Sequence, residues 1–341
     1  MYLTTPALAL TAFLLAPGPL ALAAPAADGE KFFPDPALAL LDDFSAVLNS
    51  QAPGQSSVCA MTAAIQGRAM LNELRSEFLV DIAGCVNITD SVEAKACIDE
   101  SWSELLEEFE ELKEIHAARL DLCGLLGGGA YDPVIQPSSF VQAIDHPLHP
   151  LPQGARWTYH RPTPEGLEVI DTVVLEDKET ILGIDCTVVR VVETIGGQLE
   201  EVTLDYYAQD TAGNVWYFGE DSQTYGGEDP AQELAEIAGS WKSGVDGAKP
   251  GIVMHAVPVI GMTYRQEYLL NEAEDAATIL TVEPMVTVPA GTFPGVLRVR
   301  DFSPLEPDEN ENKFYAPGVG LVSDLDVNTG VASELVKFSL P

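Results

Sequence analysis

Four of the five cysteines follow a symmetric spacing. They stand at Cys59, Cys85, Cys97 and Cys123, so the intervals are 26, 12 and 26 residues, and the fifth is Cys186. If both long intervals are helices, each is ~39 Å long, whereas a disulfide requires Cα atoms within ~7 Å. In an antiparallel hairpin only the pairings Cys85–Cys97 and Cys59–Cys123 are then feasible. The spacing predicts a helical hairpin with a disulfide at each end.

Apolar residues recur every three or four positions in both intervals, as they do along one face of a helix. Those of the first interval are Ala63, Gly67, Met70, Leu74, Phe78 and Ile82. Those of the second are Ile98, Trp102, Leu105, Phe109, Leu112, Ile115 and Leu120. Thr89 or Asp90 can cap the second helix, and Asp35-Pro36 indicates the start of a third, shorter helix. We therefore expect a helical domain over residues 35–124, clamped by two disulfides.

The chain begins with an apolar segment that ends in small residues. Residues 1–24 are typical of a signal peptide, so we expect a secreted or periplasmic protein. The disulfides fit such a compartment. No Cys-x-x-Cys pair occurs, which disfavours metal binding or redox chemistry by the cysteines.

The composition is strongly acidic. Asp and Glu number 53 against 17 Lys and Arg, for a net charge of -36. A surface of this charge repels phosphate backbones and anionic lipid, so neither nucleic acid nor an anionic membrane is expected as a partner. The acidity is explained by solubility or a saline habitat, or alternatively by specific cation binding.

After a Pro- and Gly-rich linker at residues 125–152, the pattern changes. Residues 153–341 contain short runs rich in Val, Ile, Thr and Tyr, separated by turn residues, and lack an alternation of strands with helices. This predicts an antiparallel, curved β-sheet domain and an α+β fold class for the chain. One short helix is expected at residues 229–239, where Asp229-Pro230 precedes it and Gly239 closes it.

Three motifs in this domain resemble those of a group of uncharacterised secreted bacterial proteins. They are DYYAQDTAGNVWYFGE at 205–220, GVDGAKPGIVM at 244–254 and YAPGVGLV at 315–322. The last is also similar to the closing strands of LolA-type periplasmic proteins. That similarity implies a curved sheet that binds lipid in a half-barrel; the first group implies no activity.

Aromatic residues gather on two strands joined by a tight turn. Neighbouring residues of a strand point to opposite faces, so one face packs in the core and the other is available to a ligand. Tyr207, Trp216 and Tyr217 are the candidate ligand-binding residues.

The turn itself, Asp210-Thr-Ala-Gly-Asn214, is explained by the backbone angles that Asp, Gly and Asn tolerate. Its alternative interpretation is a Ca²⁺ site with Asp210, Asn214, Glu220 and Asp221 as oxygen ligands. It departs from the EF-hand pattern because Ala212 offers no side-chain oxygen.

Motifs for a nucleophile elbow, a zinc protease, a P-loop and a dinucleotide site do not occur in the sequence. The leading hypothesis is a non-catalytic protein that binds an apolar or amphipathic, lipid-like small ligand in the β domain, with no cofactor. One alternative is an extracellular hydrolase that uses paired carboxylates. The other is a structural or surface protein that depends on Ca²⁺.

Overall fold

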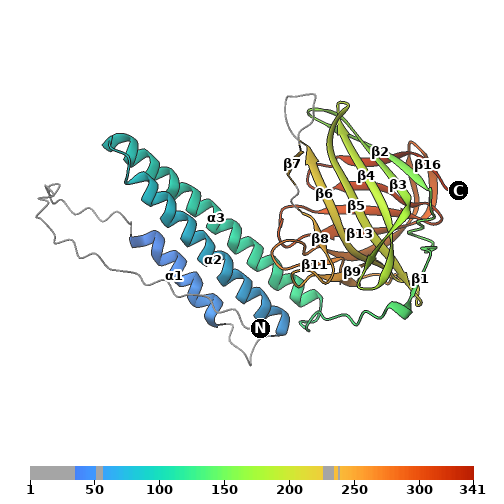
Figure 1. Cartoon of the computed structure of the whole chain (residues 1–341), viewed down its shortest axis with the longest axis horizontal. Helices are drawn as coiled ribbons and strands as arrows, with labels where there is room; N and C mark the ends of the chain where they lie inside the picture. Colours follow the sequence, from blue (N-terminus) through green and yellow to red (C-terminus); the bar gives the residue numbers. More distant parts are fainter. Residues whose placement is uncertain (1–34, 51–56, 226–233, 237–238) are drawn as a thin grey trace, which may run out of the picture.

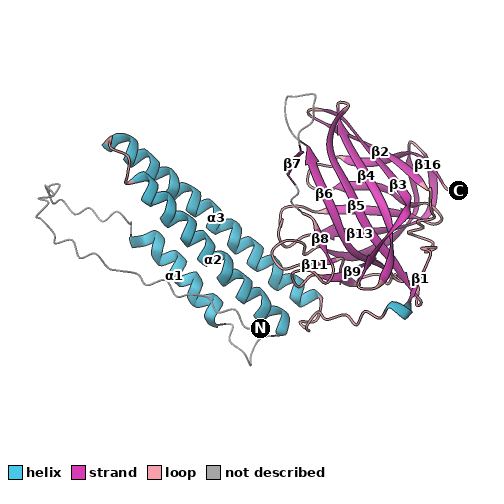
Figure 2. Cartoon of the chain, viewed as in Figure 1, coloured by secondary structure: helices cyan, strands magenta, loops and turns pink. Residues whose placement is uncertain are grey.

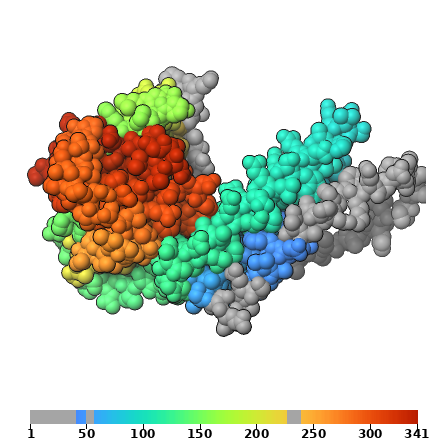
Figure 3. Space-filling model, turned by 180° about the vertical axis from the view of Figure 1, so that it is seen from behind, coloured from blue at the N-terminus to red at the C-terminus, as the bar shows by residue number. Residues whose placement is uncertain are grey.

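A computed structural model describes residues 35–50, 57–225, 234–236 and 239–341. Three helices form an arm that projects from a large sheet (Figures 1 and 2). The view from behind shows the same arm leaving the rounded sheet domain (Figure 3). The predicted signal peptide, residues 1–24, lies outside the described residues.

Two long helices form the predicted hairpin, and a third packs beside them. They are α1 (Asp35–Ser50), α2 (Val58–Cys85) and α3 (Ser91–Leu125). Ser57 caps α2, its Oγ accepting a hydrogen bond from the Ala60 N–H at 3.1 Å. Asp90 caps α3, with its carboxylate accepting from the N–H groups of Val92 and Glu93. Both caps satisfy N–H groups that lack partners within a helix.

The disulfide pairing is the predicted one. Cys59 pairs with Cys123 at the base of the hairpin, and Cys85 pairs with Cys97 at its tip, with Cα separations of 5.6 and 5.5 Å. Cys186 is a buried free cysteine. Burial raises its thiol pKa to about 12, so the reactive thiolate is disfavoured.

The apolar stripes of the two long helices form the core of the arm. Phe78 and Trp102 meet with ring centroids 4.5 Å apart, and Phe109 contacts Phe44 of α1 edge to face. Buried aromatic and aliphatic side chains of this kind stabilise a fold by ~1.5–3 kcal/mol each. The periodicity of the stripes therefore accounts for the helical packing.

The described strands form one antiparallel sheet. The strands of its first half are β1 (Phe140–Val141), β2 (Arg156–Thr163), β3 (Gly166–Ile181), β4 (Ile184–Ile195), β5 (Gln198–Asp210), β6 (Val215–Tyr225), β7 (Leu234–Glu236) and β8 (Trp241–Lys242). Those of its second half are β9 (Lys249–Met254), β10 (Thr263–Arg265), β11 (Glu267–Tyr268), β12 (Ala276–Val288), β13 (Gly291–Phe302), β14 (Glu311–Ala316), β15 (Gly320–Asp326) and β16 (Ala332–Ser339). The predicted fold class, α+β with a curved antiparallel sheet, is confirmed.

The sheet curves until its two edges nearly meet. Its order runs β10-β12-β13-β14-β15-β16-β2-β3-β4-β5-β6-β9-β11, so β16 joins the C-terminal strands to β2. In Figure 1 the green and yellow strands lie in front of the red and orange ones as two layers of this sheet. The short segment 263–268 bonds to β12 through β10 and to β9 through β11. It therefore connects both edges.

A glycine permits this connection. A Cβ atom on Gly251 of β9 would lie 2.1 Å from the Gln266 carbonyl oxygen, so only glycine fits there. The Pro250-Gly251 pair had hidden β9 from sequence analysis, because both residues are depleted in strands.

The expectation of a helix at residues 229–239 is wrong for the part of this range that the structure describes. Residues Leu234–Glu236 form β7, which pairs with β6, and 229–233 and 237–238 lie outside the described residues. The available strand edge of β6 explains the difference, since backbone pairing overrides weak local helix signals. Within the predicted linker, β1 pairs with β5.

Inside the curved sheet lies the largest apolar core, with Trp157, Tyr159, Ile279, Val299 and Leu335 among its buried members. The Trp157 indole N–H donates to the Val319 carbonyl at 2.9 Å. Among the helices of the described chain, none is long and apolar enough to span a membrane.

Candidate ligand-binding site

Side chains alternate between the two faces of a strand, so every second residue of a strand points into the curved sheet. On β2 these are Trp157, Tyr159 and Arg161, at every second position. Trp157 stands opposite Thr172 of β3, and Tyr159 opposite Ile170. The inward face therefore changes from apolar to charged along β2.

A pocket of about 410 Å³ opens among these side chains. It lies within the range of small-molecule sites, about 300–1,000 Å³. Its lining residues come from β2, β3, β4, β5, β14, β15 and β16, with further contributions from the segment before β2. Strands from both halves of the sheet thus build one site.

One wall of the pocket is apolar and continues into the core. It is formed by Leu151, Trp157, Ile170, Val189, Val191 and Leu321, with Tyr159 and Tyr207 beside them. The Tyr159 hydroxyl donates to the Leu321 carbonyl at 3.0 Å. The aromatic ring is thereby fixed, and its polar end is satisfied.

A second part of the lining, the charged wall, adjoins the apolar wall along the same strands and carries six charged side chains. These are Arg161, Glu193, Asp205, Glu311, Lys313 and Asp324. Lys313 forms an ion pair with Asp301 at 2.7 Å and lies 3.7 Å from Glu311. Arg161 pairs with Glu168, which is almost fully buried. Both basic groups already have acidic partners, so the wall retains an excess of carboxyl groups.

Burial raises the pKa of several of these carboxyl groups toward neutrality. It raises the pKa of Glu193 to about 7, with Glu168 and Glu201 adding to the effect. The pKa of Asp324 is raised to about 7 by burial, against the attraction of Lys313. Burial likewise raises the pKa of Asp205 to about 6. A cation bound nearby would favour the ionised form of these carboxyls.

Of the three aromatic residues predicted to bind ligand, the structure places Tyr207 in the pocket. Tyr217 stacks on it, with centroids 4.8 Å apart, but is not among the lining residues. Trp216 packs near Phe140 in a separate core cluster, and its indole N–H donates to Asp210 at 2.8 Å. The prediction therefore locates one lining residue and its stacking partner.

Tyr217 connects the pocket to a further carboxyl. Its hydroxyl lies 2.7 Å from Asp205 Oδ1 and 2.8 Å from Glu220 Oε2. A hydroxyl carries one proton, so both hydrogen bonds form only when one of the carboxyls is protonated. Burial, with Asp205 adding to it, raises the pKa of Glu220 to about 8, which assigns that proton to Glu220.

Of the four residues considered for Ca²⁺, Asp210 and Asn214 contact each other, whereas Glu220 and Asp221 have other partners. The Asp210 carboxylate accepts hydrogen bonds from the Ala212 and Asn214 N–H groups, the Asn214 amide and the Trp216 indole. Glu220 contacts Tyr217, whereas Asp221 accepts from the Tyr206 hydroxyl. In the described part of the chain no group of three or more Asp, Glu, His or Cys is arranged to hold a metal ion.

Sequence reasoning missed the charged wall. Arg161 stands two positions after Tyr159 and four after Trp157 on the same strand. The alternation of side chains along a strand therefore predicts that it faces inward with them. Lys313 and Asp324 stand opposite each other on β14 and β15, and nothing local in the sequence shows that this pair faces β4. His149, from the predicted linker, also borders the pocket.

Comparison with known proteins gives little guidance. No family model matches the chain, and no curated protein matches it. A solved structure, described as that of a proposed lipoprotein from Parabacteroides distasonis, is similar to part of it. The two are 16% identical, the match covers 56% of this chain and 98% of the other, and the TM-score is 0.30.

Proposed function

We propose that this is an exported, non-catalytic binding protein whose interior pocket holds an amphipathic ligand with an apolar body and a cationic head. The observation that carries the proposal is the pocket itself, in which an apolar wall adjoins a carboxyl-rich wall on the same strands.

The apolar wall suits a hydrocarbon or aromatic body. Trp157 and Val189 are almost fully buried, and they are held by a core that extends behind them. Each ligand methylene that leaves water for such a wall contributes ~0.8 kcal/mol. The volume of the pocket limits this body to a short chain or a small ring system.

The charged wall favours a cation over an anion. Four carboxyl groups line it against two basic groups, and both basic groups are already paired. An ammonium head placed near Glu193 and Asp324 would favour the ionised form of these carboxyls and would pair with a buried negative charge. An anionic head would meet repulsion instead.

Export is supported by the two disulfides and by the apolar start of the sequence. Disulfides persist in oxidising compartments, and the signal-like segment is the expected route to one. We accordingly place the protein outside the cytoplasm.

The test compares three ligands that share one alkyl chain. Isothermal titration calorimetry with hexyltrimethylammonium, hexyl sulfate and hexyl maltoside, each below its micelle concentration, separates head-group charge from chain burial. We expect the cationic ligand to bind with about one molecule per chain and at least ~10-fold more tightly than the others, since one ion pair in this setting is worth ~1.4 kcal/mol or more.

A charge-matched pair of variants controls this experiment. Glu193→Gln with Asp324→Asn removes two carboxyls from the pocket and should abolish the preference for the cationic head. Asp171→Asn with Asp185→Asn makes the same charge change at exposed positions and should leave it intact. Equal affinity of wild type for all three ligands, or no binding, would contradict the proposal.

A second candidate function, carboxylate-based hydrolysis, has one observation in its favour. Burial raises the pKa of Glu193 to about 7, a value suited to a general acid, and other carboxyls share its pocket. The test is release of nitrophenol from a panel of nitrophenyl glycosides. Turnover that disappears in Glu193→Gln would replace the binding proposal with this one.

A further inference from the structure

A second cavity lies where the helical arm meets the sheet. It measures about 390 Å³ and is bounded by α2, the end of α3, the segment after α3, and β9 to β11 with the loop that comes next. It shares no lining residue with the interior pocket. The two cavities are therefore separate, and a ligand of this one is independent of the function proposed for the other.

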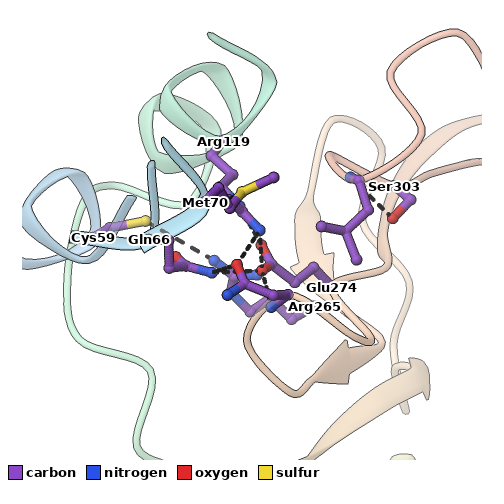
Figure 4. Close-up of polar contacts among 9 residues, drawn as sticks. Cys59, Gln66, Met70, Arg119, Arg265, Glu274 and Ser303 are labelled. Carbon is purple, nitrogen blue, oxygen red and sulfur yellow. Dashed lines mark hydrogen bonds and ion pairs between the residues drawn. The ribbon is translucent and has the colours of Figure 1, made fainter. Parts of the chain in front are cut away.

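One side of this cavity is fixed by buried polar contacts (Figure 4). Arg119 of α3 donates to both Glu274 carboxylate oxygens, at 3.0 and 2.7 Å. Gln66 of α2 donates to the same carboxylate at 2.7 Å. Asn271 Oδ1 accepts from Arg119 at 2.9 Å. These groups satisfy one another and hold the helices against the sheet.

Arg265 stands in the same cavity without such a partner. Its guanidinium lies over the rings of Tyr268 and Tyr131, 5.2 and 5.9 Å from their centroids. Nη2 lies 3.9 Å from the Cys59 sulfur, and Nη1 is buried with no hydrogen-bond partner among the described residues. A buried guanidinium nitrogen without an acceptor carries the full cost of desolvation.

The charges that line the cavity do not balance. Arg119 is neutralised by Glu274, and Lys249 pairs with Asp132 at 2.9 Å near the rim. With Arg265, the lining contains three cationic side chains and two carboxylates. A single unpaired positive charge therefore remains, in a chain whose net charge is -36.

We propose that this cavity binds a small monocarboxylate, with Arg265 as the group that recognises it. A guanidinium presents parallel N–H donors that match the two oxygens of a carboxylate, and Arg265 lines the cavity with one of its nitrogens lacking a hydrogen-bond partner among the described residues. One negative charge balances the lining, whereas a dianionic phosphate would bring in an excess charge.

The remaining lining indicates the body of this ligand. Tyr131 and Tyr268 face each other with centroids 5.1 Å apart, and Leu126, Leu270 and the Cys59–Cys123 disulfide add apolar surface. The Tyr131 hydroxyl is already engaged, since it donates to the Pro250 carbonyl at 2.8 Å. The surroundings of Arg265 thus favour an aromatic or short aliphatic acid over a polyhydroxy acid.

Calorimetric titration of the full chain with benzoate, benzamide and inorganic phosphate tests the proposal. Benzamide has nearly the shape of benzoate but no charge. We expect one benzoate site, and binding of benzamide and of phosphate at least ~10-fold weaker, because a charge-assisted bidentate pair is lost or mismatched.

Amino-acid substitutions test whether benzoate binds beside Arg265. Arg265→Gln should weaken benzoate binding by about 10- to 100-fold, whereas Arg190→Gln removes an exposed arginine from β4 and should leave it unchanged. Should Arg265→Gln fold poorly by circular dichroism, Thr62→Trp fills the cavity from α2, leaves Arg265 in place and should also abolish binding. Any of three results would overturn the proposal. They are no binding of benzoate to wild type, binding of phosphate as tight as that of benzoate, and full benzoate affinity in a folded Arg265→Gln or Thr62→Trp variant.

Discussion

Arg119 on α3 holds Glu274 of the sheet domain through two hydrogen bonds, and the two side chains are only 3% and 2% exposed. The residues are 155 positions apart in the sequence. This ion pair is the principal polar link between the arm and the sheet, and Gln66 adds to it from α2.

Removal of one partner should destabilise the junction strongly. Glu274→Ala leaves the Arg119 charge buried and unpaired, which costs about 3–5 kcal/mol in comparable buried pairs. Urea unfolding followed by circular dichroism measures the loss. Lys95→Ala is the matched control, because its pair with Asp99 is 74% and 63% exposed and such pairs contribute ~1 kcal/mol or less. Equal losses in the two variants would contradict the assignment.

Glu220 should make the stability of the ligand-free protein depend on pH. Burial, with Asp205 adding to it, raises its pKa to about 8 from an ordinary value of 4.5. Between these values the folded protein keeps a proton that the unfolded chain releases, so this group lowers stability as pH rises. The effect is absent below pH 4.5 and complete above pH 8.

Glu220→Gln keeps an oxygen acceptor for Tyr217 but removes the titration. We expect the melting temperature of the variant, relative to wild type, to increase steadily from about pH 5 to about pH 8. The histidines are common to both proteins, so their contributions cancel in the difference. Glu165→Gln, at the exposed turn between β2 and β3, makes the same substitution at the surface and is the control. A constant difference for Glu220→Gln would show that its pKa is ordinary.

The helical arm could be predicted almost completely, because each constraint on it is local. Cys85 and Cys97 flank the short turn of one hairpin, and the stripe that contains Phe78 repeats at the helical period. Most of the long strands are predicted by their composition, whereas β1, β7 and β9 are not. The curvature of the sheet is not predicted either, because it depends on pairings such as β16 with β2, which join opposite ends of the domain.

The two sites were largely invisible for the same reason. Tyr207 was found because aromatic residues stand out on a strand. Arg265 is a candidate binding residue because of its contacts with Cys59 and Tyr131, which are more than 130 positions away in the sequence. It is also a candidate because its Nη1 has no hydrogen-bond partner among the described residues. Such relations arise only when the arm and the sheet are placed together.

Asp210 should contribute stability as a turn residue, independently of calcium. Burial acts to raise its pKa, but the hydrogen bonds from Asn214, Trp216 and Ala212 outweigh it and hold the pKa below 3.8. Its stabilising effect is therefore present above that pH and lost on acidification. Asp210→Ala should lower the free energy of unfolding by about 2 kcal/mol.

Asp185→Ala is the comparison for this turn, since Asp185 receives one side-chain hydrogen bond, from Thr180, and is exposed. Its effect should be smaller. Because four N–H groups already occupy the Asp210 oxygens, neither EDTA nor added Ca²⁺ should shift the melting temperature of wild type. A decrease with EDTA that Ca²⁺ reverses would restore the calcium hypothesis.

The two disulfides should differ in their contribution to stability. Cys59–Cys123 spans 64 residues and Cys85–Cys97 spans 12. In the loop-entropy model, crosslinks of these lengths stabilise by ~4.3 and ~2.8 kcal/mol. The basal disulfide also borders the cavity of Arg265. Paired Cys→Ser variants, compared by urea unfolding, should therefore lose ~1.5 kcal/mol more at the base than at the tip. A larger loss at the tip would indicate that native strain or residual structure outweighs loop length.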